Sequence, residues 1–270
     1  MITLFTTCRD FAGIHGEVQR NAIKSWTLLK PRPEILLIGD ENGAAETAKE
    51  FGCRHIRSVS CTTWGTPLIS ALFWTAKEMG RGQVLCYVNS DILLMGHFTG
   101  AVAAVQAKLE RFLMVGPRWG LVRPLGSEFA PGWEDRVLKG LARGGGKRHK
   151  PTGLDYFAFT KDVYAPSKWP PLAVGRTQWD SWLVFRAREN GVRVVDCTQA
   201  ITVVHQDHGK VPGVKTVETG WNRTFARERF GRGYVWDAEY RLGPAPDYEL
   251  TEAPGADELW ARDVGWEDWK

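Results

Sequence analysis

The chain has 270 residues, of which 43% are hydrophobic and 24% are charged, and its formal net charge is +4. These proportions are ordinary for a globular protein and exclude a chain that is disordered throughout. No run of about 20 apolar residues occurs, and the opening segment MITLFTTCRDF lacks the apolar core of a signal peptide. We therefore expect a soluble, cytoplasmic protein without a transmembrane segment.

The cysteines and tryptophans narrow the class of protein only slightly. The five cysteines are odd in number, widely scattered and without a CxxC pair, which argues against a disulfide framework and against a structural zinc site. The chain also has 13 tryptophans. Their flat rings suit sugars and bases, but such large apolar side chains mostly build cores.

The first hundred residues alternate between strand and helix patterns. Short apolar runs predict strands at 2–6, 34–39, 55–60 and 84–88, and periodic apolar positions predict helices at 16–29, 41–52 and 66–80. Pro67 would lie in the first turn of the third helix, where its missing N–H is harmless. Four strands separated by helices predict an α/β fold with a mixed, mainly parallel central sheet flanked by helices.

Ligands of such sheets usually lie beyond the carboxyl ends of the strands. Thr7, Asp40 and Asp91 follow three of the predicted strands and should share that edge. The segment after the first strand, TTCRDFAGIHGE, lacks the GxGxxG of a dinucleotide-binding domain, and no lysine-bearing glycine loop of a nucleotidyltransferase is present near the N-terminus.

Residues 87–94 read YVNSDILL, in which Asp91 interrupts two apolar runs. Burying a carboxylate costs several kcal/mol unless it is paired or bound to a metal. Asp91 therefore needs a partner elsewhere in the chain.

The second half is less regular. Strands are predicted at 112–116, 155–160, 192–196 and 200–206, and a helix at 178–190. The segment LARGGGKRHKP reads as a mobile loop, and from residue 243 the chain is rich in proline and acidic residues.

Several blocks together resemble a family of nucleotide-sugar glycosyltransferases with the GT-A fold. They are TTCRDF, WGTPL, YVNSDILL, GLDYFAFTKDVY, PPLAVGRTQWDSWLVFRAREN and VVDCTQAITVVHQDH. The resemblance implies a GT-A domain over residues 1–242, with the nucleotide sugar and metal in 1–100 and the acceptor in 101–242. Residues 243–270 would form an extension.

The resemblance also implies a divalent ion, Mn²⁺ or Mg²⁺, at an acidic motif of DxD type. The motif here is NSD, so Asp91 is the expected carboxylate, while Asn89 replaces the first acid and Ser90 lies between them. His205 or His208 would complete the metal ligands. Since positions three apart in an extended chain point to opposite faces, we expect only one of them, preferably His205, to reach the ion.

Other residues are candidates for donor binding on the same resemblance. Arg9 and Arg176 would assist the diphosphate, and Asp40 would accept a hydrogen bond from the base or ribose. The helix start in WGTPL would present N–H groups to the donor. Surface arginines, a solvated acid and a Thr66 helix cap are the simpler alternatives. The complete donor set is Thr7, Arg9, Asp40, Gly65, Thr66, Pro67, Asn89, Ser90, Asp91 and Arg176.

Two carboxylates are candidates for catalysis. In inverting members of the fold a single carboxylate deprotonates the acceptor hydroxyl, and Asp180 in QWDSW is our candidate for this general base. Asp155 would orient the sugar or the acceptor. Helix capping is the alternative for Asp180, and the stereochemistry stays open.

Three functions therefore remain open. The first is a metal-dependent hexosyl- or pentosyltransferase that uses a nucleotide-sugar donor and a glycan or small-molecule acceptor. The second transfers the sugar to a DNA base, and the third is a non-catalytic binding protein. The basic segment GGGKRHK could close over a phosphorylated acceptor, a lipid phosphate surface or DNA, although a solvated loop is the commoner meaning. The oligomeric state stays open.

Overall fold

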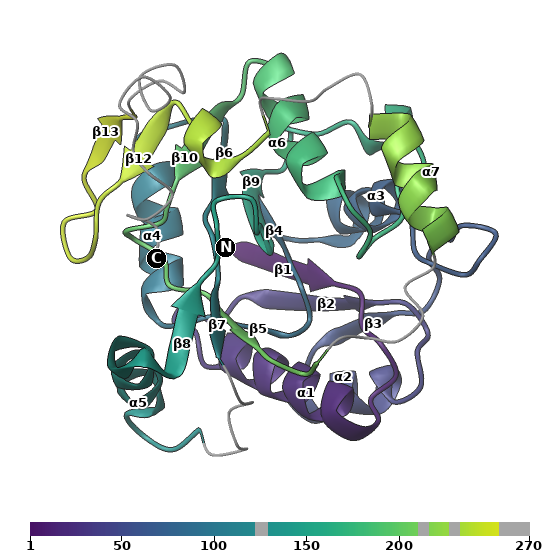
Figure 1. Cartoon of the computed structure of the whole chain (residues 1–270), viewed down its shortest axis with the longest axis horizontal. Helices are drawn as coiled ribbons and strands as arrows, with labels where there is room; N and C mark the ends of the chain where they lie inside the picture. The colour runs from purple at the N-terminus through teal and green to yellow at the C-terminus, as the bar shows by residue number, and fades with distance from the viewer. Residues whose placement is uncertain (122–128, 210–215, 227–232, 254–270) are drawn as a thin grey trace.

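The computed structural model describes residues 1–121, 129–209, 216–226 and 233–253, which form a helix-covered sheet with a smaller sheet at one side (Figure 1). The large sheet contains β1 (Ile2–Thr6), β2 (Glu34–Ile38), β3 (Arg54–Ile56), β4 (Val84–Val88), β6 (Phe112–Val115), β9 (Tyr156–Thr160), β10 (Arg193–Asp196), β12 (Tyr240–Leu242) and β13 (Leu250–Glu252). The small sheet contains β5 (Ile92–Leu93), β7 (Trp119–Leu121), β8 (Gly146–Arg148) and β11 (Val204–Gln206). The helices are α1 (Gly13–Thr27), α2 (Ala44–Phe51), α3 (Ile69–Met79), α4 (His97–Gln106), α5 (Trp133–Gly140), α6 (Trp179–Glu189) and α7 (Thr216–Ala226).

The nine strands of the large sheet lie in the order β13-β12-β10-β6-β9-β4-β1-β2-β3. All neighbours pair in parallel except at β9, which is antiparallel to both β4 and β6, and at β13, which is antiparallel to β12. Because β9 reverses the direction twice, β4 and β6 run the same way and end at the same edge. The predicted mixed, mainly parallel α/β sheet is confirmed.

The central strands bury both faces, which explains their continuous apolar runs. In β1, Leu4 packs into the core beneath α1 and α4, while Phe5 packs into the opposite core with α3 and α6. Cys86 and Tyr87 divide in the same way along β4. This alternation fixes which strand-end side chains project at the edge where β4 ends.

The small sheet has the order β5-β11-β7-β8 and packs against α5 (Figure 1). Its strand β8 contains part of the segment that we predicted to be a mobile loop, and that prediction is wrong. Residues 146–148 pair antiparallel with β7, so the basic side chains there belong to a sheet. A Cβ on Gly146 would lie 2.7 Å from the Gly120 carbonyl oxygen, so this close approach requires glycine.

The third predicted helix begins later than expected. Helix α3 starts at Ile69, because Pro67 and Leu68 form isolated bridges with Cys61 and Ala173. Pro67 therefore precedes the helix, and Thr66 is not its N-cap.

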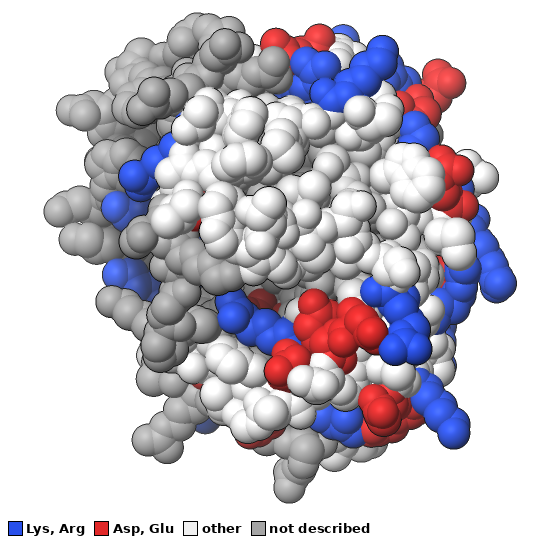
Figure 2. Space-filling model, turned by 90° about the vertical axis from the view of Figure 1, so that its right-hand side faces the viewer, with Lys and Arg blue, Asp and Glu red and all other residues white. Residues whose placement is uncertain are grey.

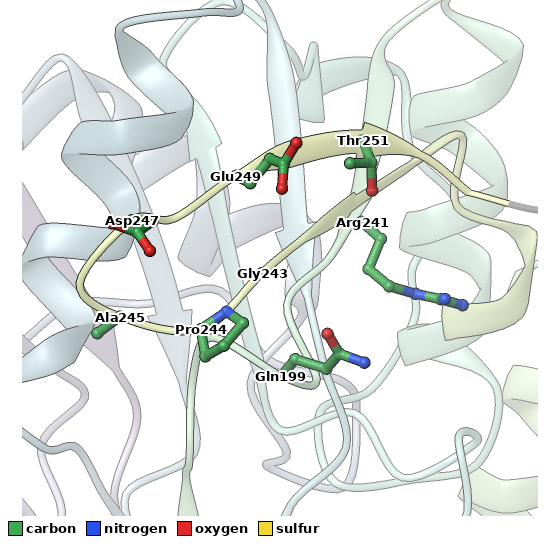
Figure 3. A pocket seen from close by; sticks show the side chains of 8 residues that line it. All are labelled: Gln199, Arg241, Gly243, Pro244, Ala245, Asp247, Glu249 and Thr251. Atoms are coloured by element: carbon green, nitrogen blue, oxygen red, sulfur yellow. The ribbon is translucent and has the colours of Figure 1, made fainter.

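Strand β13 extends the large sheet beyond residue 242, while residues 254–270 lie outside the described part. The boundary at 242 therefore stays a prediction. The β12–β13 hairpin borders a pocket of about 270 Å³, whose lining includes Gln199, Arg241 and Asp247 (Figure 3). None of the predicted site residues lines it.

The side of the molecule that carries α3 and α7 has a broad surface of uncharged side chains bordered by charged ones (Figure 2). Large exposed apolar side chains from this region include Trp64, Trp74, Val217 and Phe225. Within the described ranges, no helix combines the length and the apolarity needed to span a bilayer.

One buried tryptophan ties α1 to β5. Trp26 is fully buried, and its Nε1–H donates to the Ile92 carbonyl oxygen at 2.9 Å. We expect Trp26→Phe to lower the free energy of unfolding by about 1–3 kcal/mol, because this buried hydrogen bond is lost. Urea denaturation measures the change. In the control Trp74→Phe the exposed ring should change stability by less than about 0.5 kcal/mol, and equal losses in both variants would contradict the assignment.

Candidate functional site

Asp91 lies in the turn between β4 and β5, where the wholly buried β4 leaves the large sheet. In the small sheet, His205 of β11 pairs with Ile92 of β5, directly after this turn. The pairing places His205 Nε2 3.3 Å from Asp91 Oδ2. Two strands that are more than a hundred residues apart in sequence therefore bring the carboxylate and the imidazole together.

A second imidazole contacts the same carboxylate oxygen. Strand β11 ends at Gln206, and two residues later His208 Nε2 lies 3.1 Å from Asp91 Oδ2. The assumption that the segment stays extended is wrong, since both imidazoles contact Asp91, while the number of histidines that reach an ion stays a prediction. His208 Nδ1 is 3.1 Å from the Gly209 carbonyl oxygen, so both ring nitrogens face acceptors. The hydrogen bond with Asp91 raises the pKa of His208.

The charge on Asp91 is stabilised by these partners. Burial alone would raise the pKa of the carboxyl group, but the hydrogen bonds and positive charge of His205 and His208 outweigh it and hold the pKa well below its usual range. Asp91 Oδ1 is buried and has no hydrogen-bond partner among the described residues. A buried carboxylate oxygen without a partner calls for a further ligand at this point.

This set of ligand atoms fits a divalent transition metal. One oxygen of Asp91 and one nitrogen from each of His205 and His208 all lie within 4.8 Å of one another. One carboxylate and two imidazoles suit Mn²⁺ better than they suit Mg²⁺, which prefers oxygen ligands. The ring of His15 in α1 lies 4.8 Å from the ring of His208, and burial followed by the charge of His208 lowers its pKa. No motif in the sequence indicated His15.

The first position of the NSD motif serves as a hydrogen-bond donor. Asn89 Nδ2–H donates to Asp155 Oδ1 at 2.6 Å, and Arg118 donates to the other carboxylate oxygen. Asp155 is only 4% exposed, so both bonds stabilise a buried charge. An acid in place of Asn89 would put two carboxylates in contact. Asp155 therefore explains why this position carries an amide.

Arg118 was not among the residues predicted from the sequence, although its position after a strand could have indicated it. It follows β6, which runs parallel to β4 and ends at the same edge. The rule that selected Thr7, Asp40 and Asp91 would also have selected Arg118 if β9 had been recognised as the antiparallel strand between β4 and β6.

Asp180 lies in the first turn of α6, as predicted. It follows Gln178, whose φ of +80° turns the chain into the helix, and Asp180 Oδ1 accepts from the Ser181 N–H at 2.9 Å. Burial is the largest cause that raises the pKa of Asp180 to about 6, and the charge of Asp155 adds to it. Arg118 acts in the opposite direction, so these three charges share one neighbourhood.

The loop after β1 is fastened to the NSD motif through Gln19 of α1. Gln19 Oε1 accepts from the Arg9 N–H at 2.7 Å and from the Ser90 hydroxyl at 3.0 Å. Thr7 Oγ1 is buried without a hydrogen-bond partner in the described ranges. Thr7, Arg9 and Ser90 thus lie at the same edge as Asp91, as the sequence led us to expect.

Other predicted donor residues are engaged with the protein itself. Arg57 binds the exposed Asp40 through two hydrogen bonds of 3.0 Å. Arg176 donates to Glu218 of α7 at 2.8 and 2.6 Å and to Thr66 Oγ1 at 3.2 Å. Glu218 is fully buried, so Arg176 neutralises an internal charge.

The remaining two donor candidates lie in the loop before α3. Gly65 has φ +84° and nothing lies within 4 Å of an added Cβ, while Pro67 forms the bridge with Cys61. Because α3 begins at Ile69, neither residue belongs to the first turn of a helix.

Neither family models nor curated proteins match this sequence. Solved structures do match it. Glucosyl-3-phosphoglycerate synthase from Mycobacterium tuberculosis in complex with phosphoglyceric acid has a TM-score of 0.51 and 12% identity, covering 94% of this chain and 87% of that chain. The same enzyme with Mn²⁺, uridine diphosphate and glucosyl-3-phosphoglycerate has a TM-score of 0.49 and 12% identity, covering 94% and 88%.

This chain has the GT-A fold. S. aureus TarS 1–349 in complex with UDP-GlcNAc is a more partial match, with a TM-score of 0.35, 12% identity and coverage of 48% of this chain. The match spans 36% of that TarS chain. At 12% identity the similarity concerns the fold alone, and the function of this chain depends on the residues of its own site.

Mn²⁺ binding tests the cluster directly. We expect Asp91→Asn to weaken Mn²⁺ binding at least about tenfold, because the only carboxylate of the cluster is lost. His205→Ala and His208→Ala should each weaken it as well. Calorimetric titration measures the affinity. In the control Asp162→Asn, which removes an exposed partner of Arg111, binding should be unchanged. Wild-type affinity in Asp91→Asn would exclude this metal site.

Proposed function

We propose that this protein is a metal-dependent glycosyltransferase that moves a hexosyl or pentosyl unit from a nucleotide-diphosphate sugar to an acceptor hydroxyl. The observation that carries the proposal is the cluster of Asp91, His205 and His208 at the edge where β4 ends. The GT-A fold supports it, since ligands of open α/β sheets lie beyond the carboxyl ends of the strands. A cytoplasmic location remains part of the proposal.

The residues around the cluster would hold the donor. Asp91, His205 and His208 would bind Mn²⁺ or Mg²⁺, which would neutralise the charge that develops on the departing diphosphate. Thr7 offers a buried hydroxyl without a partner in the described part of the chain. Arg9 is exposed at the same edge and can approach an anion, while Gln19 holds its backbone and Ser90 in place. Arg176 and Asp40 would serve the donor only if they left Glu218 and Arg57.

Asp180 is suited to the general base of an inverting transfer. A pKa of about 6 leaves the carboxylate ionised at neutral pH and still basic enough to accept a proton. The acceptor oxygen would attack the anomeric carbon, its proton would pass to Asp180, and the bond to the diphosphate would break. Asp155 would position this region through Arg118 and Asn89 rather than take part in proton transfer, because both of its oxygens accept hydrogen bonds.

Nucleotide binding is the first test. We expect UDP, GDP, CDP or dTDP at millimolar concentration to raise the midpoint of thermal unfolding in the presence of Mn²⁺, because ligands that bind only the folded state stabilise it. The rise should disappear in Asp91→Asn and persist in Asp162→Asn. No rise with any of the four nucleotides would contradict the proposed function. Binding without turnover of any donor sugar would instead favour the non-catalytic binding protein.

The pH dependence tests Asp180. A general base acts as the carboxylate, so we expect kcat/KM to fall about tenfold for each pH unit below about 6 and to level off above it. Donor-sugar transfer measured between pH 4.5 and 8 gives the profile. Asp180→Asn should abolish this dependence together with most of the activity.

Asp180→Asn should remove activity, but we expect it to stabilise the folded protein. Because the folded-state pKa of Asp180 is raised, the ionised group destabilises the folded protein as the pH rises from about 4 through about 6. Asp180→Asn should therefore raise the unfolding temperature at pH 8 relative to wild type. Lower stability together with full activity would contradict the assigned role.

A further inference from the structure

A basic pocket of about 530 Å³ opens next to the Asp91 cluster, and it has His205 in its wall. Most of the lining comes from β7, β8 and the residues that flank them. Its cationic side chains are Arg118, Lys147, Arg148 and Lys150. The pocket thus joins the candidate metal site to a concentrated positive charge.

The backbone that carries these cations is ordered by pairing. Strand β8 is bonded to β7 along residues 146–148, and the His149 N–H donates to the Arg118 carbonyl oxygen at 2.8 Å. Gly146 lies against Gly120 too closely for any side chain. The backbone that carries Lys147 and Arg148 is therefore fixed by the sheet before any ligand arrives, which lowers the entropy cost of binding.

The positive charge exceeds the acidic charge in the wall. Asp207 is the acid among the lining residues, and its carboxylate already accepts from the Gly209 N–H at 2.9 Å. Arg118 binds Asp155, Lys147 is exposed, and Arg148 and Lys150 also line the pocket. An anion placed here would meet several cations at once, and lysine and arginine are the usual ligands of phosphate and carboxylate groups.

The pocket is also connected to the candidate base. Arg118 lines the pocket and at the same time binds Asp155, and the charges of both residues influence the pKa of Asp180. A ligand whose anionic group lies among Lys147, Arg148 and Lys150 would therefore share a pocket wall with His205 and Arg118.

We propose that this pocket binds the acceptor, and that the acceptor is a small molecule with a phosphate or carboxylate group. This inference rests on the proposed glycosyltransferase function and specifies its acceptor class. The volume favours a small molecule, since pockets of about 300–1,000 Å³ enclose ligands of that size, whereas a DNA duplex needs an extended surface. The transferred sugar would join a hydroxyl of the bound acceptor.

The test uses the full chain and three probes that share the glucose ring, namely glucose 6-phosphate, glucuronate and glucose. Calorimetric titration at low salt, with UDP and Mn²⁺ already bound, should show binding of at least one of the two anionic probes and none of glucose. The anionic probe that binds more tightly shows whether the pocket prefers a phosphate or a carboxylate group. The affinity should fall as the salt concentration rises, because the attraction is electrostatic.

A charge reversal locates the site. Lys147→Glu should weaken binding of the anionic probe by about tenfold or more, because a charged hydrogen bond is replaced by repulsion. In the matched control Lys139→Glu, an exposed lysine of neighbouring α5 that does not line the pocket, the affinity should be unchanged. Equal unfolding temperatures of both variants would show that the fold is intact.

Several results would overturn this inference. They are equal binding of glucose and the charged sugars, no binding of either anion, or an unchanged affinity in Lys147→Glu. Competition between UDP and the anionic probe would assign the pocket to the donor diphosphate. Tight, salt-sensitive binding of duplex DNA without binding of the sugar phosphate would favour the DNA acceptor. Metal-dependent UDP binding in these same experiments would leave the proposed function standing, whereas its absence would refute that function separately.

Discussion

The site depends on the cost of partly burying one carboxylate, that of Asp91. Asp91 follows an entirely buried strand, and an ionised group in that position has to be compensated by opposite charge or by hydrogen bonds. The fold supplies the compensation through β11, which pairs with β5 and places His205 and His208 on one oxygen of Asp91. The other oxygen is left without a partner within the described residues. The small sheet therefore holds this acid in place and at the same time leaves part of its coordination capacity unused.

A second compensated acid organises the neighbouring region. Asp155 is nearly inaccessible, and Asn89 and Arg118 saturate its two oxygens. Asn89 and Asp91 are two residues apart in one turn, so the same turn serves both acids. Electrostatics explains the departure from a DxD motif. Asn89 Nδ2 lies 2.6 Å from Asp155 Oδ1, so the first position of the motif needs a hydrogen-bond donor and not a second carboxylate. The positive charge of Arg118 then connects this pair to the pocket beside β8.

The sequence predicted the parts of this arrangement that depend on local patterns. Apolar runs located β1, β2, β4 and β9, and the rule about strand ends selected Thr7 and Asp91 correctly as neighbours. Local sequence patterns could not predict which distant strands pair with each other. The antiparallel insertion of β9 between β4 and β6 hid Arg118, and the end of β11 at Gln206, two residues before His208, hid the second histidine contact. The glycine-rich segment before Lys147 looked mobile because glycine favours loops, yet here glycine permits two strands to approach.

The two histidines also explain how the site can be stable with and without an ion. In the metal-free protein, the hydrogen bond with Asp91 raises the pKa of His208, so a proton can supply positive charge beside the carboxylate. A divalent ion would supply more charge to the same oxygen, but it requires neutral imidazoles, so metal and proton compete for the same nitrogens. Since Asp91 is compensated in either case, loss of the ion would not leave a bare buried charge. Under the proposed function, metal binding would then be reversible without unfolding the turn that carries Asp91.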